Sequence, residues 1–298
     1  MQYAIIAVTR SRAAKMSEIK DFNRGKITWC LGCADYALLN AVKRAFVELK
    51  LEPHQIAFTS GIGCSSKISY WTTSYGFSGS HGRGIPLTIG AKLANRNLVV
   101  FSAGGDGDIY GEGVNHFIHA ARKNHDITLI VHNNQVYGLT TGQKTSTSEK
   151  GFITITSPDG VKEEPLNPLL LALSSGATFI ARSFAGDMMH TTKMIAEGIK
   201  HKGFAYIDIF QPCVTYNYLN TYDYWKEKCY DLQKTKHNIR DKGEAFKSMM
   251  EWGKKIPVGI FYKEERQTFE EFYPQTKVPL YKHDISNVNV DKLLDEFK

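Results

Sequence analysis

The run Leu98-Val99-Val100-Phe101-Ser102, followed by Gly105-Asp106-Gly107-Asp108, decides the fold of this chain. Its first five residues are mostly apolar and rich in β-branched side chains, which is typical of a buried strand. The glycines that follow allow the backbone to turn sharply and to approach a ligand closely. Asp106 then offers a hard carboxylate oxygen of the kind that Mg²⁺ prefers. The pattern predicts a strand that ends at a site for a metal-bound diphosphate.

A second strand predicts a partner for Asp106 at the same edge of a sheet. Ile127–His132 (ITLIVH) is another apolar run, and Asn134 follows it, 28 positions after Asp106. That distance accommodates a strand end, a crossover helix and the next parallel strand. Both oxygen ligands would then lie at the carboxyl edge, where open α/β sheets bind ligands. The alternative is a plain turn and an Asn-rich loop.

The chain contains a C-x-x-C pair, Cys30 and Cys33, among its five cysteines. Two thiolates at this spacing can bind one metal centre, because the short loop turns both sulfurs the same way. A redox pair and half of a zinc ribbon are alternatives. Zinc usually needs a second closely spaced pair, which this sequence does not contain.

Two further cysteines follow predicted strands. Cys64 comes after the apolar run 56–60, and Cys213 comes after the strand-like segment Phe204–Phe210. Both would therefore lie at the same edge of the sheet as Asp106 and Asn134. Four thiolates fit a [4Fe–4S] cluster. An isolated cysteine is more often a buried apolar residue, so the hypothesis depends on the set of four.

Alternating strands and helices predict an α/β fold with a doubly wound, mostly parallel sheet. We expect helices over 36–49, 85–94, 111–123 and 187–201, and strands over 56–60, 98–102, 127–132, 177–182 and 204–210. The Thr-, Ser- and Gly-rich segment 140–166 predicts a long loop, which in compact domains is often functional.

Three regions are predicted along the chain. Residues 1–26 form a polar, basic amino-terminal arm, 27–230 form the cofactor-binding domain, and 231–298 form a carboxyl-terminal extension. Aromatic residues such as Trp252 and Phe261 stand among many charges in the extension. We therefore expect the extension to lie against a partner subunit; a locally packed tail is the alternative.

Composition excludes several classes of protein. The 298 residues carry a formal charge of +7, and no stretch approaches 18 consecutive apolar residues, so we expect no membrane span. An odd number of cysteines argues against a secreted disulfide framework and favours the cytoplasm. Aromatic and basic residues are not interleaved as in single-strand nucleic-acid binders, so we expect no nucleic-acid partner.

Together these features closely resemble the β subunit of the 2-oxoacid:ferredoxin oxidoreductases, over residues 27–230. The segments that carry the resemblance are Trp29–Cys33, Gly61–Lys67, Ser80–Arg83, Gly104–Asp108, Asn115–Ala120, His132–Thr140 and Gln211–Cys213. Two stretches depart from the family pattern: 140–143 (TTGQ) stands where a TGGQ-like stretch is usual, and 145–147 (TST) lacks a proline. These departures leave open the pocket wall beside the cofactor, and with it the substrate.

The resemblance implies a thiamine-diphosphate enzyme that converts pyruvate or 2-oxoglutarate to acyl-CoA and CO₂. It implies Mg²⁺ bound by Asp106, Asn134 and the carbonyl of Val136, and one [4Fe–4S] cluster bound by Cys30, Cys33, Cys64 and Cys213. The implied partners are coenzyme A, ferredoxin and an α subunit with a fused or separate γ domain. The implied cofactor-binding residues are Ile62, Gly63, Cys64, Ser65, His81, Gly105, Asp106, Gly107, Asp108, Asn134, Val136, Gly138 and Leu139.

Some single residues keep two interpretations. His81 can donate a hydrogen bond to the diphosphate or simply occupy a turn. Lys67 can contact the substrate carboxylate or be an ordinary exposed lysine. Asp108 can serve the diphosphate loop or cap a helix. Two other functions also stay open: a thiamine-diphosphate decarboxylase or ligase without a cluster, and a non-catalytic iron–sulfur carrier.

Overall fold

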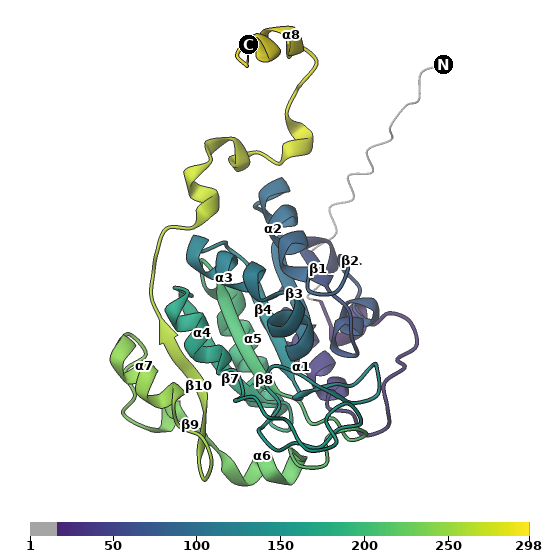
Figure 1. The fold of residues 1–298 in the computed structure, drawn as a ribbon. Coiled ribbons are helices and arrows are strands. Elements are labelled where there is room, and N and C mark those ends of the chain that lie inside the picture. Colours follow the sequence, from purple (N-terminus) through teal and green to yellow (C-terminus); the bar gives the residue numbers. More distant parts are fainter. Residues whose placement is uncertain (1–16, 298) are drawn as a thin grey trace.

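The chain folds around one eight-stranded sheet with strand order β2-β1-β3-β4-β8-β7-β10-β9 (Figure 1). The computed structural model describes residues 17–297. The strands of the sheet are β1 (Ile56–Ser60), β2 (Tyr75–Ser78), β3 (Val99–Gly105), β4 (Thr128–Asn133), β7 (Phe179–Phe184), β8 (Ala205–Phe210), β9 (Cys229–Asp231) and β10 (Ile256–Lys263). A separate hairpin joins β5 (Val136–Tyr137) to β6 (Gln143–Lys144).

The sheet is parallel from β2 to β7, which confirms the predicted fold class. Only the pairing of β10 with β7 is antiparallel. Gly105 at the end of β3 is in register with His132 near the end of β4. The loops after β1, β3, β4 and β8 therefore begin at one edge of the sheet, as open parallel sheets require of a ligand site.

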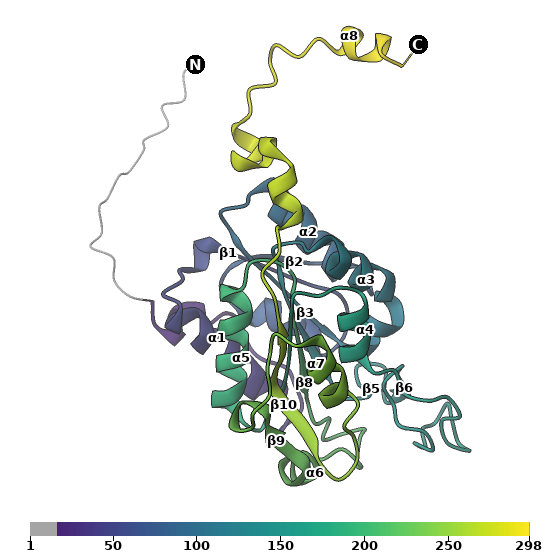
Figure 2. The ribbon, with the colours of Figure 1, turned by 90° about the vertical axis from the view of Figure 1, so that its left-hand side faces the viewer.

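Helices cover both faces of the sheet, as Figure 2 shows with the sheet seen edge-on. The helices are α1 (Asp35–Glu48), α2 (Gly84–Ala94), α3 (Val114–Lys123), α4 (Pro168–Ser174), α5 (Met188–Lys200), α6 (Tyr222–Lys228), α7 (Lys242–Met249) and α8 (Val290–Asp295). α1 and α5 pack on one face with Phe101, and α2, α3, α4 and α7 pack on the other with Val100. Successive strand residues point to opposite faces, so each strand serves both cores.

The predicted strands and helices are present within a few residues of their expected bounds. Two differences lie at the deciding stretch. β3 runs on to Gly105, so the strand includes the first glycine of the Gly-Asp-Gly sequence. The predicted helix 111–123 is preceded by a π-helical turn, η4 (Gly107–Glu112). Such wide turns occur frequently at functional sites.

The predicted boundaries of the central domain are wrong at both ends. The amino-terminal residues 1–16 lie outside the described part, but η1 (Ile19–Phe22) already belongs to the core, because Phe22 is fully buried against Phe46. The boundary at residue 230 falls inside β9. β10, predicted as part of the extension, is a buried strand of the sheet, and it includes Phe261.

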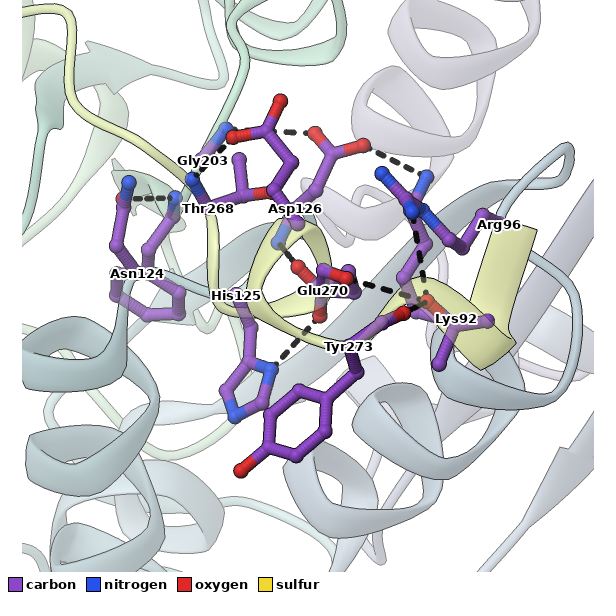
Figure 3. Close-up of polar contacts among 12 residues, drawn as sticks. Lys92, Arg96, Asn124, His125, Asp126, Gly203, Thr268, Glu270 and Tyr273 are labelled. Atoms are coloured by element: carbon purple, nitrogen blue, oxygen red, sulfur yellow. Dashed lines mark hydrogen bonds and ion pairs between the residues drawn. The ribbon is translucent and has the colours of Figure 1, made fainter.

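The segment after β10 is anchored at the amino edge of the sheet by buried polar contacts (Figure 3). Glu270, in η6 (Phe269–Phe272), is 1% exposed and lies 2.8 Å from Nδ1 of His125. Its other oxygen accepts the backbone N–H of Asp126. The carboxylate of Asp126 pairs in turn with Lys92 of α2, at 2.7 Å. Beyond η7 (Pro274–Lys277) and η8 (Leu280–Lys282), the chain extends away from the body and ends with α8 (Figure 1).

Within residues 17–297, every helix is too short or too polar to cross a membrane.

Candidate active site

Two adjoining cavities open at the carboxyl edge of the sheet. The first, which we call the cofactor cavity, is lined by Ile62, Gly63, Cys64, Ser65, His81, Gly105, Asp106, Gly107, Asp108, Asn134, Val136, Tyr137, Gly138, Leu139 and Thr140. The structure thus brings together all thirteen residues that the sequence proposes for cofactor binding. Tyr137 and Thr140 are additional. The cavity encloses about 70 Å³.

Asp106 is a buried carboxylate held by hydroxyl groups. It is 1% exposed, and its Oδ2 accepts hydrogen bonds from Oγ1 of Thr145 at 2.5 Å and of Thr147 at 2.7 Å. Burial raises the pKa of Asp106 to about 6, although these two hydroxyls oppose the shift. Among the described residues, no cationic side chain forms an ion pair with it. A carboxylate desolvated in this way, without a positive partner, suits a metal cation.

Asn134 is fixed by two hydrogen bonds in the loop after β4. Its Oδ1 accepts the N–H of Val136 at 3.0 Å, and its Nδ2 donates to Oε1 of Gln211 at 2.8 Å. An amide oxygen has two lone pairs, so Oδ1 can accept this bond and still ligate a metal. Residues 17–297 contain no cluster of three or more His, Cys, Asp or Glu side chains arranged around a metal ion. The set at this site differs in kind, because it combines one carboxylate with an amide and a main-chain carbonyl.

Asp108 ties two glycine loops to the cofactor cavity. Its Oδ1 accepts the N–H groups of Ile62 at 3.1 Å and Gly82 at 2.8 Å, and lies 2.9 Å from Nδ1 of His81. A β-carbon at Gly61 would lie 2.1 Å from Oδ2 of Asp108, so only glycine fits there. Burial raises the pKa of Asp108. This carboxylate orders the loops and does not cap a helix.

The second cavity, which we call the cysteine cavity, contains all four predicted ligand cysteines. It encloses about 210 Å³ and is lined by Thr28, Trp29, Cys30, Cys33, Asp35, Cys64, Lys67, Asn134, Gly138, Leu139, Gln211, Cys213, Val214, Thr215 and Tyr216. Cys229 lines a different cavity, beside α5 and α6. Cys64, Asn134, Gly138 and Leu139 line both the cysteine cavity and the cofactor cavity, so the two share a wall.

The thiols of the cysteine cavity are held as free, protonated groups. All are free cysteines, and burial raises the pKa of Cys64 to about 11. Burial also raises the pKa of Cys33, where the nearby Asp35 acts in the same direction, and that of Cys213. Thiols bind metals as thiolates, so a metal centre here would release their protons. Lys67 lines this cavity and not the cofactor cavity, which places it beside the cysteines.

Sequence reasoning does not find several polar residues of the site. Thr145 and Thr147 stand in a stretch that is distinguished only by its departure from the family pattern, yet both bind Asp106. Gln211 enters the sequence pattern only as part of the motif before Cys213. His132 is fully buried, and its Nδ1 lies 2.6 Å from Oδ1 of Asp35. The available signal is position, since each follows a strand or lies in the loop after β6.

Comparisons with known proteins agree with this geometry. Residues 54–209 match the family described as "Thiamine pyrophosphate enzyme, C-terminal TPP binding domain". Residues 213–278 match the family described as the C-terminal part of the pyruvate ferredoxin oxidoreductase beta chain. The fold, the cofactor cavity and the first match together define a thiamine-diphosphate-dependent enzyme.

Whole-chain relatives narrow that class. The 2-oxoacid:ferredoxin oxidoreductase subunit beta of Saccharolobus solfataricus is 43% identical over 256 residues, which are 82% of this chain and 84% of the relative. Subunit beta of 2-oxoacid:ferredoxin oxidoreductase 1 from Aeropyrum pernix is 42% identical over 254 residues, covering 82% and 80%. The chain therefore belongs to the β subunits of the 2-oxoacid:ferredoxin oxidoreductases.

A solved structure shows the same fold. The 2-oxoglutarate:ferredoxin oxidoreductase from Magnetococcus marinus, determined with 2-oxoglutarate, coenzyme A and succinyl-CoA bound, superimposes with a TM-score of 0.87. It is 35% identical, and the match covers 95% of this chain and 96% of that one.

Proposed function

We propose that this chain carries the diphosphate half of the cofactor site and the cluster of an enzyme that oxidatively decarboxylates pyruvate or 2-oxoglutarate. The products are acyl-CoA and CO₂, and ferredoxin takes the electrons. The observation that carries the proposal is the wall shared by the cofactor cavity and the cysteine cavity. A cofactor that becomes electron-rich and a centre that accepts electrons would lie on opposite sides of a few side chains. Membership of the family supports the same assignment.

In this proposal Asp106, Asn134 and the carbonyl of Val136 hold Mg²⁺. The free lone pair of Asn134 and the unneutralised charge of Asp106 fit a hard cation. Thr145 and Thr147 hold one carboxylate oxygen of Asp106 by two hydrogen bonds, which fixes its direction. The N–H groups of the glycine loops and His81 stand where the diphosphate would approach.

Cys30, Cys33, Cys64 and Cys213 would hold the [4Fe–4S] cluster. The four thiols line one cavity although they come from three separate loops, and a cluster needs ligands spread more widely than a single ion does. Thiamine diphosphate supplies the carbon nucleophile for decarboxylation when bound, and the cluster takes electrons singly. The part of this chain is to orient both, to keep them adjacent through Gly138 and Leu139, and to exclude water from between them.

The cofactor site requires a second chain. A cavity of about 70 Å³ is far smaller than the roughly 300 Å³ of the smallest usual ligand pockets, so it encloses only part of a cofactor. Ile62 and Leu139 at its rim are 40% and 45% exposed, which suits a covering partner. None of its lining residues in the described chain is a glutamate, and the family resemblance assigns the activating glutamate to the α subunit. We propose an α subunit, with a fused or separate γ domain, as this partner in the cytoplasm.

The carboxyl-terminal segment 278–297 is proposed as a second contact with a partner subunit. It projects from the body in Figure 1 and exposes Tyr281 and Ile285 to 77% and 75%. Truncation after residue 277 should leave the folded domain intact, because the anchoring contacts of Glu270 are retained. Loss of co-purification with the α subunit would support the contact, and unchanged assembly would contradict it.

One experiment tests the proposed function. The chain is purified anaerobically with its α subunit and assayed for iron, thiamine diphosphate and 2-oxoacid-dependent viologen reduction. Pyruvate, 2-oxoglutarate and branched 2-oxoacids are supplied in turn. Both cofactors and coenzyme A-dependent turnover are expected. Cofactor without iron would favour a decarboxylase, and iron without thiamine diphosphate would favour an electron carrier.

Two matched variants test the cluster ligands. Cys213→Ser should reduce the iron content, whereas Cys229→Ser should leave it unchanged, because Cys229 lies outside the cysteine cavity. The chain without its α subunit should show no turnover. Robust turnover by the chain alone would refute the two-chain site.

A further inference from the structure

Gln211 lies in the wall that separates the two cavities. It is the first residue after β8, it is 1% exposed, and its backbone N–H donates to the carbonyl of Asn133 at 2.9 Å. A glutamine so fully buried must satisfy its amide within the protein. Its side chain therefore has a fixed direction set by its neighbours.

The amide group of Gln211 contacts one residue of each proposed metal site. Its Oε1 accepts the hydrogen bond of Asn134 Nδ2 at 2.8 Å. Its Nε2 lies 3.5 Å from Sγ of Cys33, to which it donates, and 3.2 Å from the carbonyl of Pro212. The opposite orientation of the amide would place NH₂ against NH₂ at Asn134, so the contacts allow only one orientation.

We propose that Gln211 is a positioning residue shared by the two centres, orienting the Mg²⁺ ligand Asn134 and hydrogen-bonding the cluster ligand Cys33. This inference rests on the proposed function, since it takes Asn134 and Cys33 as ligands. It adds a residue that links the centres directly through one side chain.

The two contacts have separate physical effects. By binding Nδ2 of Asn134, Gln211 turns the opposite atom, Oδ1, toward the cofactor cavity. Hydrogen-bond partners of metal ligands commonly change metal affinity by about 10- to 100-fold when removed. An N–H bond to a cluster sulfur stabilises the reduced, more negative state, and so raises the reduction potential. Asp35, whose Oδ2 lies 3.6 Å from the same sulfur, acts in the opposite direction.

Gln211→Met tests both effects, because it keeps the length of the side chain and removes both polar contacts. In the anaerobic complex with the α subunit, two quantities are measured: the cluster midpoint potential by redox titration followed by electron paramagnetic resonance, and the Mg²⁺-dependent affinity for thiamine diphosphate by calorimetry. The dissociation constant should rise about tenfold. The potential should fall, with each tenfold loss in the one-electron reduction constant corresponding to about 59 mV.

Gln135→Met is the matched control. Gln135 is also buried and lies beside Asn134, but its Oε1 has no partner within the described chain. Its φ of 61° strains both side chains alike. The control should leave the potential unchanged.

A second variant separates the two contacts. Gln211→Glu keeps an oxygen for Asn134 and removes the NH₂ group, so the cofactor affinity should stay near that of the wild type while the potential falls. A wild-type potential in Gln211→Met with its cluster intact would overturn the inference, and so would an unchanged cofactor affinity. A wild-type complex without cluster or cofactor would instead remove the proposed function itself.

Discussion

Replacing Asp106 by asparagine should stabilise the cofactor-free protein while abolishing Mg²⁺-dependent cofactor binding. The carboxyl has a pKa of about 6 instead of 3.8, chiefly because it is buried. A raised carboxyl pKa means that the folded state binds the proton more tightly, so stability falls as the pH rises from 3.8 to about 6. Above pH 6 the whole penalty is present, and at 1.36 kcal/mol per pH unit it amounts to about 3 kcal/mol.

Asparagine avoids this penalty but accepts the existing hydrogen bonds less well, which costs about 1 kcal/mol. We therefore expect Asp106→Asn without cofactor to gain about 2 kcal/mol at pH 8 and nothing at pH 4. The measurement is urea unfolding at both pH values, with and without Mg²⁺ and thiamine diphosphate. The cofactor should stabilise only the wild type.

Asp208→Asn is the matched control with the opposite sign. Asp208 is equally buried, but it pairs with Arg182 at 3.0 Å. Removing one partner of a buried ion pair typically costs about 3 to 5 kcal/mol. If Asp106→Asn were no more stable than the wild type at pH 8, or if it still bound the cofactor with Mg²⁺, the account of Asp106 would be refuted.

Three further variants test other parts of the structure. Gly107→Ala should weaken cofactor binding in calorimetry, because a β-carbon there would lie 2.2 Å from the Tyr137 ring; unchanged binding would contradict this packing. Thr147→Val removes a hydroxyl that opposes the raised pKa of the metal-site carboxyl, so the pH midpoint of Mg²⁺ binding should move upward, and a downward shift would be inconsistent. Although burial opposes it, the His125 contact holds the pKa of Glu270 below its ordinary 4.5. That stability is present above pH 4.5 and lost in acid, so Glu270→Gln should lose about 1 to 3 kcal/mol at pH 7, and progressively less in acid, in urea unfolding.

Much of the site could be predicted because its signals are local. An apolar run followed at once by Gly105-Asp106-Gly107 specifies a strand, a turn and a ligand within a few residues. The same holds for Asn134 and for Cys64, each directly after a strand. Strands that share one parallel sheet bring such exits to a common edge without further information.

The remaining features depend on contacts that the sequence does not signal locally. Thr145 and Thr147 reach Asp106 from 39 and 41 residues away, through a loop with no periodic pattern. β10 escapes prediction because Pro257 and Gly259 are uncommon in strand interiors and its neighbours are charged. The sequence places Lys67 near the substrate, but the turn η3 (Ser65–Trp71) directs it to the cysteines.

The shared sheet edge also sets the order of events in biosynthesis. Cys30 and Cys213, which line the same cavity, are separated by 183 positions, so a ribosome adding 5 to 20 residues per second makes the second about 10 to 40 s after the first. A nascent chain without β8 has neither the wall nor the last thiol. Any metal centre built on these four cysteines must therefore be inserted after synthesis, into a domain that has already folded. Supply of iron and sulfide to the cell, and not translation, would then limit how much of this protein becomes competent.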